Sequence, residues 1–171
     1  KESNRIGGPF QMVQLWVNLP ATDKMTEPKY QAVTHAEMGR VSLPKGGEVE
    51  IIAGEFEGVK GPATTFSPVH LYNLKMKKGE KVELDYPEGY TTAILAIEGS
   101  AVFNGTETLP TNYLALFERD GEHITVDAVE DSVLLVMSGE PLNEPIAQYG
   151  PFLMNTKEEI AQAMRDYQMG K

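Results

Sequence analysis

The chain has 171 residues, and its 15 Lys and Arg against 25 Asp and Glu give a formal net charge of −10. Such an acidic surface repels phosphate backbones, so direct binding to nucleic acid is not expected. The absence of cysteine excludes disulfides, thiolate catalysis and thiolate metal sites. No run approaches the ~18 consecutive apolar residues of a membrane helix, and no secretory signal pattern opens the chain. We therefore expect one main domain of a soluble, cytoplasmic protein, with no membrane contact.

The first patterned segment, "FQMVQLWVNL" at residues 10–19, predicts a strand that is apolar on both faces. One face carries Val13, Leu15, Val17 and Leu19, and the other carries Phe10, Met12 and Trp16. A strand of this kind needs protein on both sides, and little chain precedes it. We expect it to complete a domain whose other strands lie outside this chain.

Residues 20–48 are polar and are interrupted by Pro20, Pro28, Pro44 and the pair Gly46 and Gly47. This composition is typical of a connecting segment.

Eight short runs of strand composition follow from Val49 onward, separated by Gly, Pro, Asn or Asp turn signals. The runs are "EVEIIAG", "VHLYNLKM", "KVELDYP", "YTTAILAIEG", "SAVFNG", "NYLALFE", "HITVDA" and "SVLLVMSG". Strands at this regular spacing predict an all-β sandwich, jelly roll or barrel.

The last patterned segment predicts one amphipathic helix. Thr156 and Glu159 form a T-x-x-E capping box at its start. Its apolar face carries Ile160, Ala163, Met164 and Tyr167, and we expect that face to dock on the barrel.

The three histidines, His35, His70 and His123, are far apart in the sequence. A local metal site needs two His at H-x-H or H-x-x-x-H spacing, which is absent. The three side chains could still meet in space around one ion. In the alternative reading His35 lies on the connection, His123 lies at a hairpin edge and His70 packs partly within a strand.

Two carboxylate pairs are candidates for acid and base chemistry if burial shifts their pKa values. Asp85 and Glu88 flank the dipeptide before an apolar strand, and Glu55 and Glu57 alternate with Phe56. The alternative is a solvated surface, which is common in a chain this rich in acidic residues. No Gly-rich phosphate loop or nucleophile elbow is present in the sequence.

Four stretches together resemble the pirin family of two-domain cupins: "FQMVQLWVNLPATDKMTEPKYQ", "IIAGEFEGVKGPATTFSPVHLYNLKM", "GEPLNEPIAQYGPFLMNTKEEI" and "DYQMG". The resemblance is to the C-terminal half of that family. It implies an all-β, cupin-type β-barrel or jelly roll, the C-terminal cupin of a bicupin, with a short C-terminal helix. The implied domains are a terminal strand segment of a missing N-terminal cupin at 1–19, an interdomain connection at 20–48, the cupin barrel at 49–155 and the helix at 156–171.

Pirins carry their metal ligands in the N-terminal cupin, as an H-x-H pair followed by a His and a Glu on later strands. In the barrel of this chain the same pattern places Asp85 and Pro87 at the two His positions, and proline has no ligand atom in its side chain. The resemblance therefore implies no catalytic, cofactor-binding or metal residue here. Iron or another divalent metal is implied for the missing N-terminal cupin.

Two functions follow from the resemblance. In the first, the intact parent is a metal-dependent, quercetin 2,3-dioxygenase-like enzyme, and this chain is its inactive, metal-free C-terminal portion. In the second, this portion is an interaction or scaffold module of a metal-sensitive regulator that binds protein partners. The expected partners are the missing N-terminal cupin, other proteins and a second copy of the chain paired through residues 10–19.

A third hypothesis places a ligand pocket inside the barrel, beside the aromatic residues Tyr72, Phe103 and Phe117. Packing of the core explains the same residues more simply.

Overall fold

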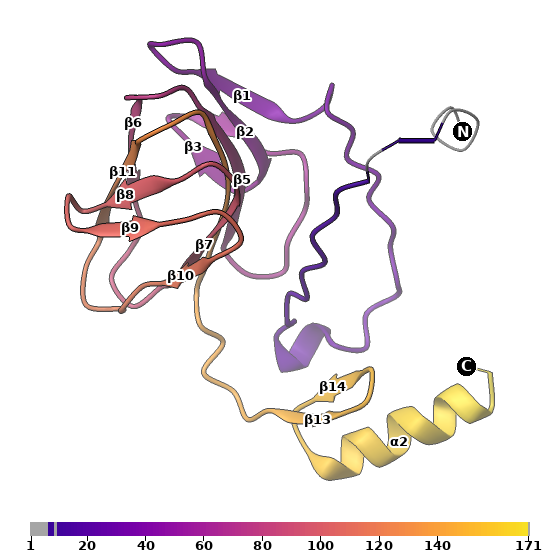
Figure 1. The fold of residues 1–171 in the computed structure, drawn as a ribbon. Helices are drawn as coiled ribbons and strands as arrows, with labels where there is room; N and C mark the ends of the chain where they lie inside the picture. Colours follow the sequence, from indigo (N-terminus) through magenta and orange to yellow (C-terminus); the bar gives the residue numbers. More distant parts are fainter. Residues whose placement is uncertain (1–6, 9, 171) are drawn as a thin grey trace. The chain divides into compact units, whose positions relative to one another are not determined.

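The computed structural model describes residues 7–8 and 10–170, and the chain divides into two compact units. The larger unit is Pro20–Pro145, and the smaller unit contains the described residues up to Leu19 together with those from Ile146. Figure 1 shows the elements of both, and each unit is described by itself.

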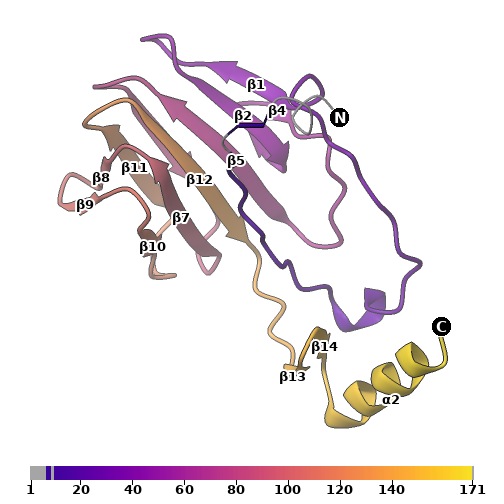
Figure 2. The same cartoon turned by 45° about the vertical axis from the view of Figure 1, so that its right-hand side comes forward.

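The larger unit is built from two antiparallel sheets (Figures 1 and 2). The six-stranded sheet has the order β1-β2-β5-β12-β7-β10, and the four-stranded sheet has the order β6-β11-β8-β9. The strands of the first are β1 (Gly39–Ser42), β2 (Glu48–Ala53), β5 (Val69–Met76), β12 (Ser132–Gly139), β7 (Thr91–Glu98) and β10 (Leu114–Leu116). Those of the second are β6 (Lys81–Asp85), β11 (His123–Ala128), β8 (Ala101–Phe103) and β9 (Glu107–Leu109).

A hairpin of β3 (Glu55–Phe56) and β4 (Val59–Lys60) and a short 3-10 helix, η1 (Ala21–Asp23), complete this unit.

Alternation along the central strands produces the core between the sheets. In β5 the buried side chains are Tyr72, Leu74 and Met76, at every second position. In β7 they are Thr92, Ile94 and Ala96, which pair in register with residues of the neighbouring strand β12 in the same sheet. The buried apolar residues of both sheets form one continuous cluster, as expected for a jelly roll.

All eight predicted strands are present, and the all-β, cupin-type jelly-roll class is confirmed. The strands form two sheets and not a closed barrel. The composition of residues 20–48 predicts a connecting segment. In the structure this segment contributes strand β1, which pairs with β2 along the whole length of β1. Strand β9 was not predicted because Leu109 is the one apolar residue of its three, so the segment shows no alternation.

The buried carboxylate of Glu80 joins two turns at one end of the larger unit. Its Oε1 accepts hydrogen bonds from the backbone N–H groups of Lys45 and Gly47, at 2.7 and 3.0 Å, and its Oε2 accepts one from Lys77 at 2.5 Å. The backbone of Glu80 also pairs with Ala128 of β11. Burial raises the pKa of the Glu80 carboxyl, but the three hydrogen bonds outweigh it and hold the pKa below its ordinary value.

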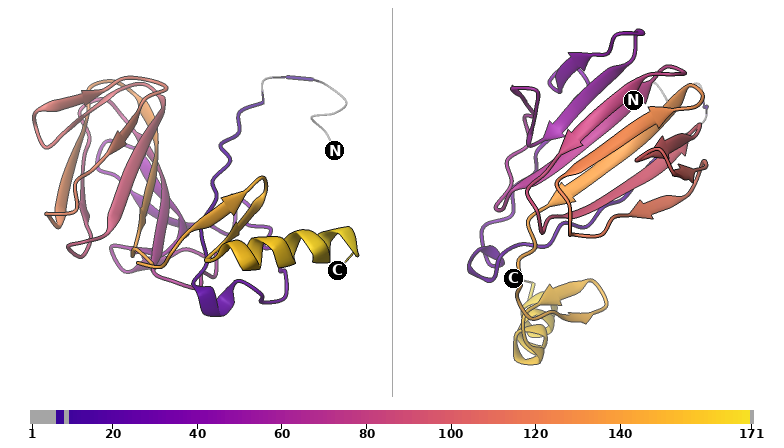
Figure 3. Two further views of the ribbon diagram at one scale, coloured as in Figure 1. Left: turned by 90° about the horizontal axis from the view of Figure 1, so that it is seen from below. Right: turned by 90° about the vertical axis from the view of Figure 1, so that its left-hand side faces the viewer.

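The smaller unit contains the hairpin of β13 (Ala147–Tyr149) and β14 (Phe152–Met154), followed by helix α2 (Lys157–Gln168) (Figure 3). The predicted capping box is confirmed, because Thr156 accepts from the backbone of Glu159 while the Glu159 side chain accepts from the backbone of Thr156. We expected the apolar face of the helix to dock on the barrel. In the structure helix α2 packs against β13 and β14, and Ile160 is the buried residue of the helix.

No helix among the described residues is long and apolar enough to cross a membrane.

Residues 10–19 differ from the prediction, because no strand ladder involves this segment within the described part of the chain. Its large apolar side chains are exposed, for example Phe10 at 85% and Trp16 at 57%. The periodicity identified an apolar segment correctly, but pairing also needs a neighbouring strand edge, and local periodicity carries no information about one.

Replacing Glu80 by Gln tests the role of the buried carboxylate. The amide oxygen can keep the bonds to Lys45 and Gly47, but the NH₂ group then faces the N–H of Lys77. We expect E80Q to lower the free energy of unfolding by about 2 kcal/mol, measured by chemical denaturation. The control is E83Q, at an exposed position of β6, and equal midpoints for the two variants would contradict the assignment.

Candidate functional site

The three histidines do not meet around one ion. Within the described ranges, each histidine contacts a different partner. His35 forms an ion pair with Glu50. His70 lies within hydrogen-bond distance of the hydroxyl of Tyr72, and His123 lies within hydrogen-bond distance of the carboxylate of Asp85. The hypothesis of a shared metal site built from all three is therefore wrong.

His70 begins a hydrogen-bonded chain beside the core. Its Nδ1 lies 2.6 Å from the hydroxyl oxygen of Tyr72, and that hydroxyl donates to the carbonyl oxygen of Glu55 at 2.5 Å. Because the Tyr72 proton is used on Glu55, Nδ1 of His70 must carry its own proton and donate it.

Two further tyrosine rings pack on His70. The ring centroids of Tyr86 and Tyr90 lie 5.2 and 6.3 Å from that of His70. Tyr86 is 6% exposed, and its hydroxyl has no hydrogen-bond partner among the described residues. We call His70, Tyr72, Tyr86 and Tyr90 the His70–tyrosine cluster.

Burial keeps this cluster uncharged near neutral pH. It lowers the pKa of His70, although the carbonyl and carboxylate of Glu55 act in the opposite direction. Burial also raises the pKa of both Tyr72 and Tyr86 above the ordinary tyrosine value. Neutral phenols and a neutral imidazole can exchange hydrogen bonds, but they offer no anionic ligand for a metal.

A pocket of about 360 Å³ opens beside the cluster, at the end of the jelly roll formed by three loops. Its aromatic walls are Tyr86, Tyr90, Phe103 and Phe117. The rings of Phe103 and Phe117 meet edge to face at 5.4 Å. Four carboxylates also line it: Glu107, Glu118, Asp120 and Glu122.

Of the two positions that the cupin pattern assigns to histidines, only Pro87 is among the residues that line this pocket. Asp85 is 77% exposed and its Oδ1 lies 2.6 Å from Nδ1 of His123, while Pro87 lines the pocket wall. The hydrogen bond to Asp85 raises the pKa of His123, and burial acts in the opposite direction. A carboxylate already paired, next to a proline, does not fit the convergent donor set that a cupin metal needs.

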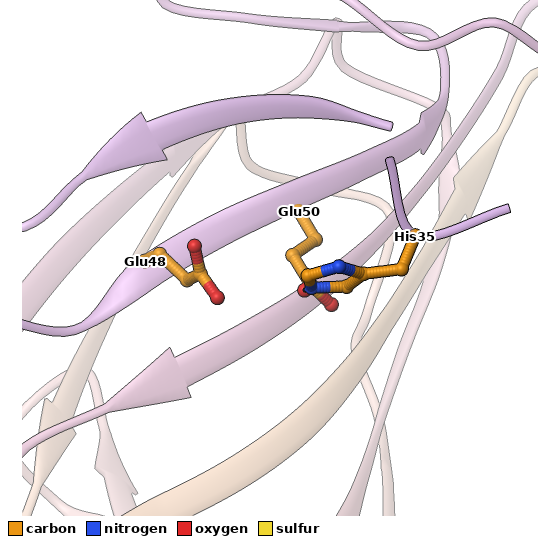
Figure 4. A group of neighbouring side chains, drawn as sticks. All are labelled: His35, Glu48 and Glu50. Carbon is orange, nitrogen blue, oxygen red and sulfur yellow. Dashed lines mark ion pairs between the residues drawn. The ribbon is translucent and has the colours of Figure 1, made fainter. Parts of the chain in front are cut away.

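A second group of possible ligands lies on the outer side of β2. His35, Glu48 and Glu50 bring ligand atoms within 4.8 Å of one another. Figure 4 shows the His35 ring over Glu50, with Glu48 further along the strand. Nε2 of His35 lies 2.6 Å from Oε1 of Glu50. The sequence analysis did not identify this group, although Glu48 and Glu50 share one face of β2 by alternation.

Cations already occupy this group. Nζ of Lys75 lies 2.5 Å from Oε1 of Glu50 and 3.5 Å from Oε1 of Glu48. The guanidinium of Arg40 contacts the ring of His35 at 2.6 Å. Burial raises the pKa of Glu50, but the hydrogen bonds from Lys75 and Asn73 and the charge of Lys75 and His35 lower it below its ordinary value. A divalent ion would have to compete with Lys75 for these carboxylates, and in the structure the group forms an ion-pair network.

The two carboxylate pairs form no buried acid–base site. Glu55, Glu57, Asp85 and Glu88 are all exposed. Glu57 lies in the turn between β3 and β4 with φ of 47°, and Glu55 lies 3.8 Å from Lys60. These four residues therefore form part of a solvated surface, as in the alternative given above.

Comparison with known proteins gives consistent matches. The model of the pirin C-terminal cupin domain matches residues 71–171. A Pseudomonas aeruginosa protein provisionally named a quercetin 2,3-dioxygenase is 44% identical over 166 residues, which are 96% of this chain and 58% of that protein. Human pirin is 35% identical over 167 residues, covering 95% of this chain and 57% of its own length.

A solved structure, the quercetin 2,3-dioxygenase of Acinetobacter baumannii at 1.88 Å resolution, superposes with a TM-score of 0.86 and 45% identity. The match covers 91% of this chain and 54% of that one. The chain thus spans less than two thirds of the length of these relatives.

Replacing Lys75 by Met tests the ion-pair network. Glu50 would remain buried without its closest cation, so we expect a loss of about 2 kcal/mol of unfolding free energy at neutral pH, less than for a fully buried pair because Lys75 is 39% exposed. Since the folded-state pKa of Glu50 is lowered, its contribution is present above the ordinary carboxyl pKa and is lost as pH falls through the folded value.

The cost of K75M should therefore shrink on going from about pH 7 to about pH 3, below the ordinary carboxyl pKa, as Glu50 takes up a proton. Denaturation curves at both pH values measure it. K77M is the matched control, because Lys77 pairs with Asp131 at an exposed position and should show little change. A cost for K75M that is independent of pH would contradict the network.

Proposed function

Because the chain belongs to the pirin family, we propose that it acts as the C-terminal cupin of a longer, quercetin 2,3-dioxygenase-like protein and holds no catalytic metal itself. The observation that carries the proposal is the chemistry at the pocket. Neutral tyrosines and Pro87 line this pocket, and Asp85, at the other position where the cupin pattern needs a histidine, is paired with His123; both features support the proposal.

The fraction of each relative that this chain covers supports the same assignment, in which the catalytic metal is bound by the part of the longer protein outside this chain. The chain matches 58% of the Pseudomonas protein and 54% of the Acinetobacter enzyme. In this proposal, the remaining part of such a protein is the N-terminal cupin that binds iron or another divalent metal. Dioxygen chemistry on a flavonol needs a redox-active metal, which no protein side chain replaces.

The exposed apolar segment supports a role in domain contact. Within residues 10–17 the exposed apolar side chains are Phe10, Met12, Val13, Leu15, Trp16 and Val17. An exposed patch of this kind marks an interaction surface. We infer that it covers the companion cupin in the longer protein, and that in its absence two copies of the chain associate through it. The alternative scaffold function would use the same surface for a different protein partner.

Metal content and quercetin turnover test the main proposal. The 171-residue chain, purified after growth with iron, nickel and copper, should contain less than about a tenth of an equivalent of metal and should not consume dioxygen with quercetin. The full-length Acinetobacter enzyme is the positive comparison. Near one equivalent of metal would overturn the proposal, and loss of that metal in E50Q would then locate it at His35, Glu48 and Glu50.

Light scattering coupled to size-exclusion chromatography tests the apolar surface. We expect the chain to be dimeric or larger, and the double variant V13S/W16S to be monomeric, because both side chains are exposed and removing them costs no core packing. The control V129S changes an exposed valine elsewhere and should leave the mass unchanged. A monomeric parent chain would contradict the association.

A further inference from the structure

We propose that the pocket beside the His70–tyrosine cluster binds a small organic cation with an aromatic body, of the aralkylammonium class. The proposal concerns the jelly roll of this chain alone and does not depend on the activity of the longer protein. It rests on the walls of the pocket, on its charge and on the rigidity of its rim.

The walls provide aromatic faces for a cation. Tyr86, Tyr90, Phe103 and Phe117 line a space of about 360 Å³, which lies within the usual range for small-molecule sites. A cation near the face of such a ring is attracted by the negative potential above it. The same faces stack on an aromatic ligand body.

The charge of the lining selects against anions. Glu107, Glu118, Asp120 and Glu122 line the pocket, and the single basic side chain there, His123, is already paired with Asp85. An anionic carboxylate, phosphate or phenolate would meet net repulsion, whereas an ammonium group is attracted. A bare metal ion gains less, because these carboxylates are exposed to water.

One wall residue adds an unused polar group. Tyr86 is 94% buried, and its hydroxyl is without a partner in the described part of the chain. A buried hydroxyl that makes no hydrogen bond is costly in a folded protein, so it marks a place where a partner is missing. A ligand or an ordered water can supply that partner.

Backbone hydrogen bonds hold the rim in place. The N–H of Tyr86 donates to the carbonyl of Glu122 at 2.9 Å, and the N–H of Gly89 donates to that of Arg119 at 3.0 Å. The N–H of Phe117 donates to the carbonyl of Thr92, also at 3.0 Å. These bonds join the loops on both sides of the pocket, so little ordering is needed when a ligand binds.

Three matched probes test the proposal: phenethylammonium, the neutral phenethyl alcohol and the anionic phenylacetate. Each is titrated to about 20 mM into the ¹⁵N-labelled chain, because ligands of this size bind weakly. We expect saturable amide shifts at residues 86–90 and 117–123 with phenethylammonium, about fivefold weaker binding of the alcohol and none of phenylacetate. Binding of the cation should weaken in about 0.5 M NaCl.

Two variants separate the pocket from general surface charge. The double variant E118Q/E122Q removes two lining charges, and F117L removes one aromatic wall while retaining an apolar side chain. Each should weaken phenethylammonium binding about fivefold. The exposed E57Q, away from the pocket, should not. Unchanged binding in E118Q/E122Q, equal binding of the three probes, or shifts confined to other regions would overturn the proposal.

Discussion

The buried carboxylate of Glu80 is the constraint on which the two-sheet arrangement depends. It lies where the chain leaves β5 of the six-stranded sheet and enters β6 of the four-stranded sheet. Its two oxygens fix the turn before β2 and the turn after β5, and its backbone pairs with β11. One side chain therefore sets the spacing of both sheets at this end. A buried charge is tolerated here because three backbone donors replace the lost water.

The side chains beside the pocket differ from Glu80, because the buried ones carry no charge. Around His70 this jelly roll packs the rings of neutral tyrosines. The carboxylates that remain lie at the rim and stay in contact with water. The same scaffold thus places aromatic walls and a rim of carboxylates around one pocket.

Much of the fold could be predicted from local pattern. The eight strands were predicted because apolar residues alternate between turn signals, and the helix because Thr156 and Glu159 form a capping box. The contribution of β1 was not predicted, because Gly39–Ser42 is short and its segment is rich in Pro and Gly. The apolar character of residues 10–17 was predicted, but their exposure was not, because exposure depends on tertiary neighbours that no local pattern contains.

The candidate sites divide in the same way. The sequence by itself determined the absence of cysteine chemistry, the placement of Asp85 and Pro87 on the cupin pattern and the resemblance to the pirin family, because each depends on residue identity and local spacing. Only the tertiary structure decided that His35 pairs with Glu50, that His70 meets Tyr72, Tyr86 and Tyr90, and that aromatic walls and a carboxylate rim enclose one pocket. Those contacts join strands and loops distant in sequence, and their geometry follows from sheet register and loop packing, which no local pattern encodes.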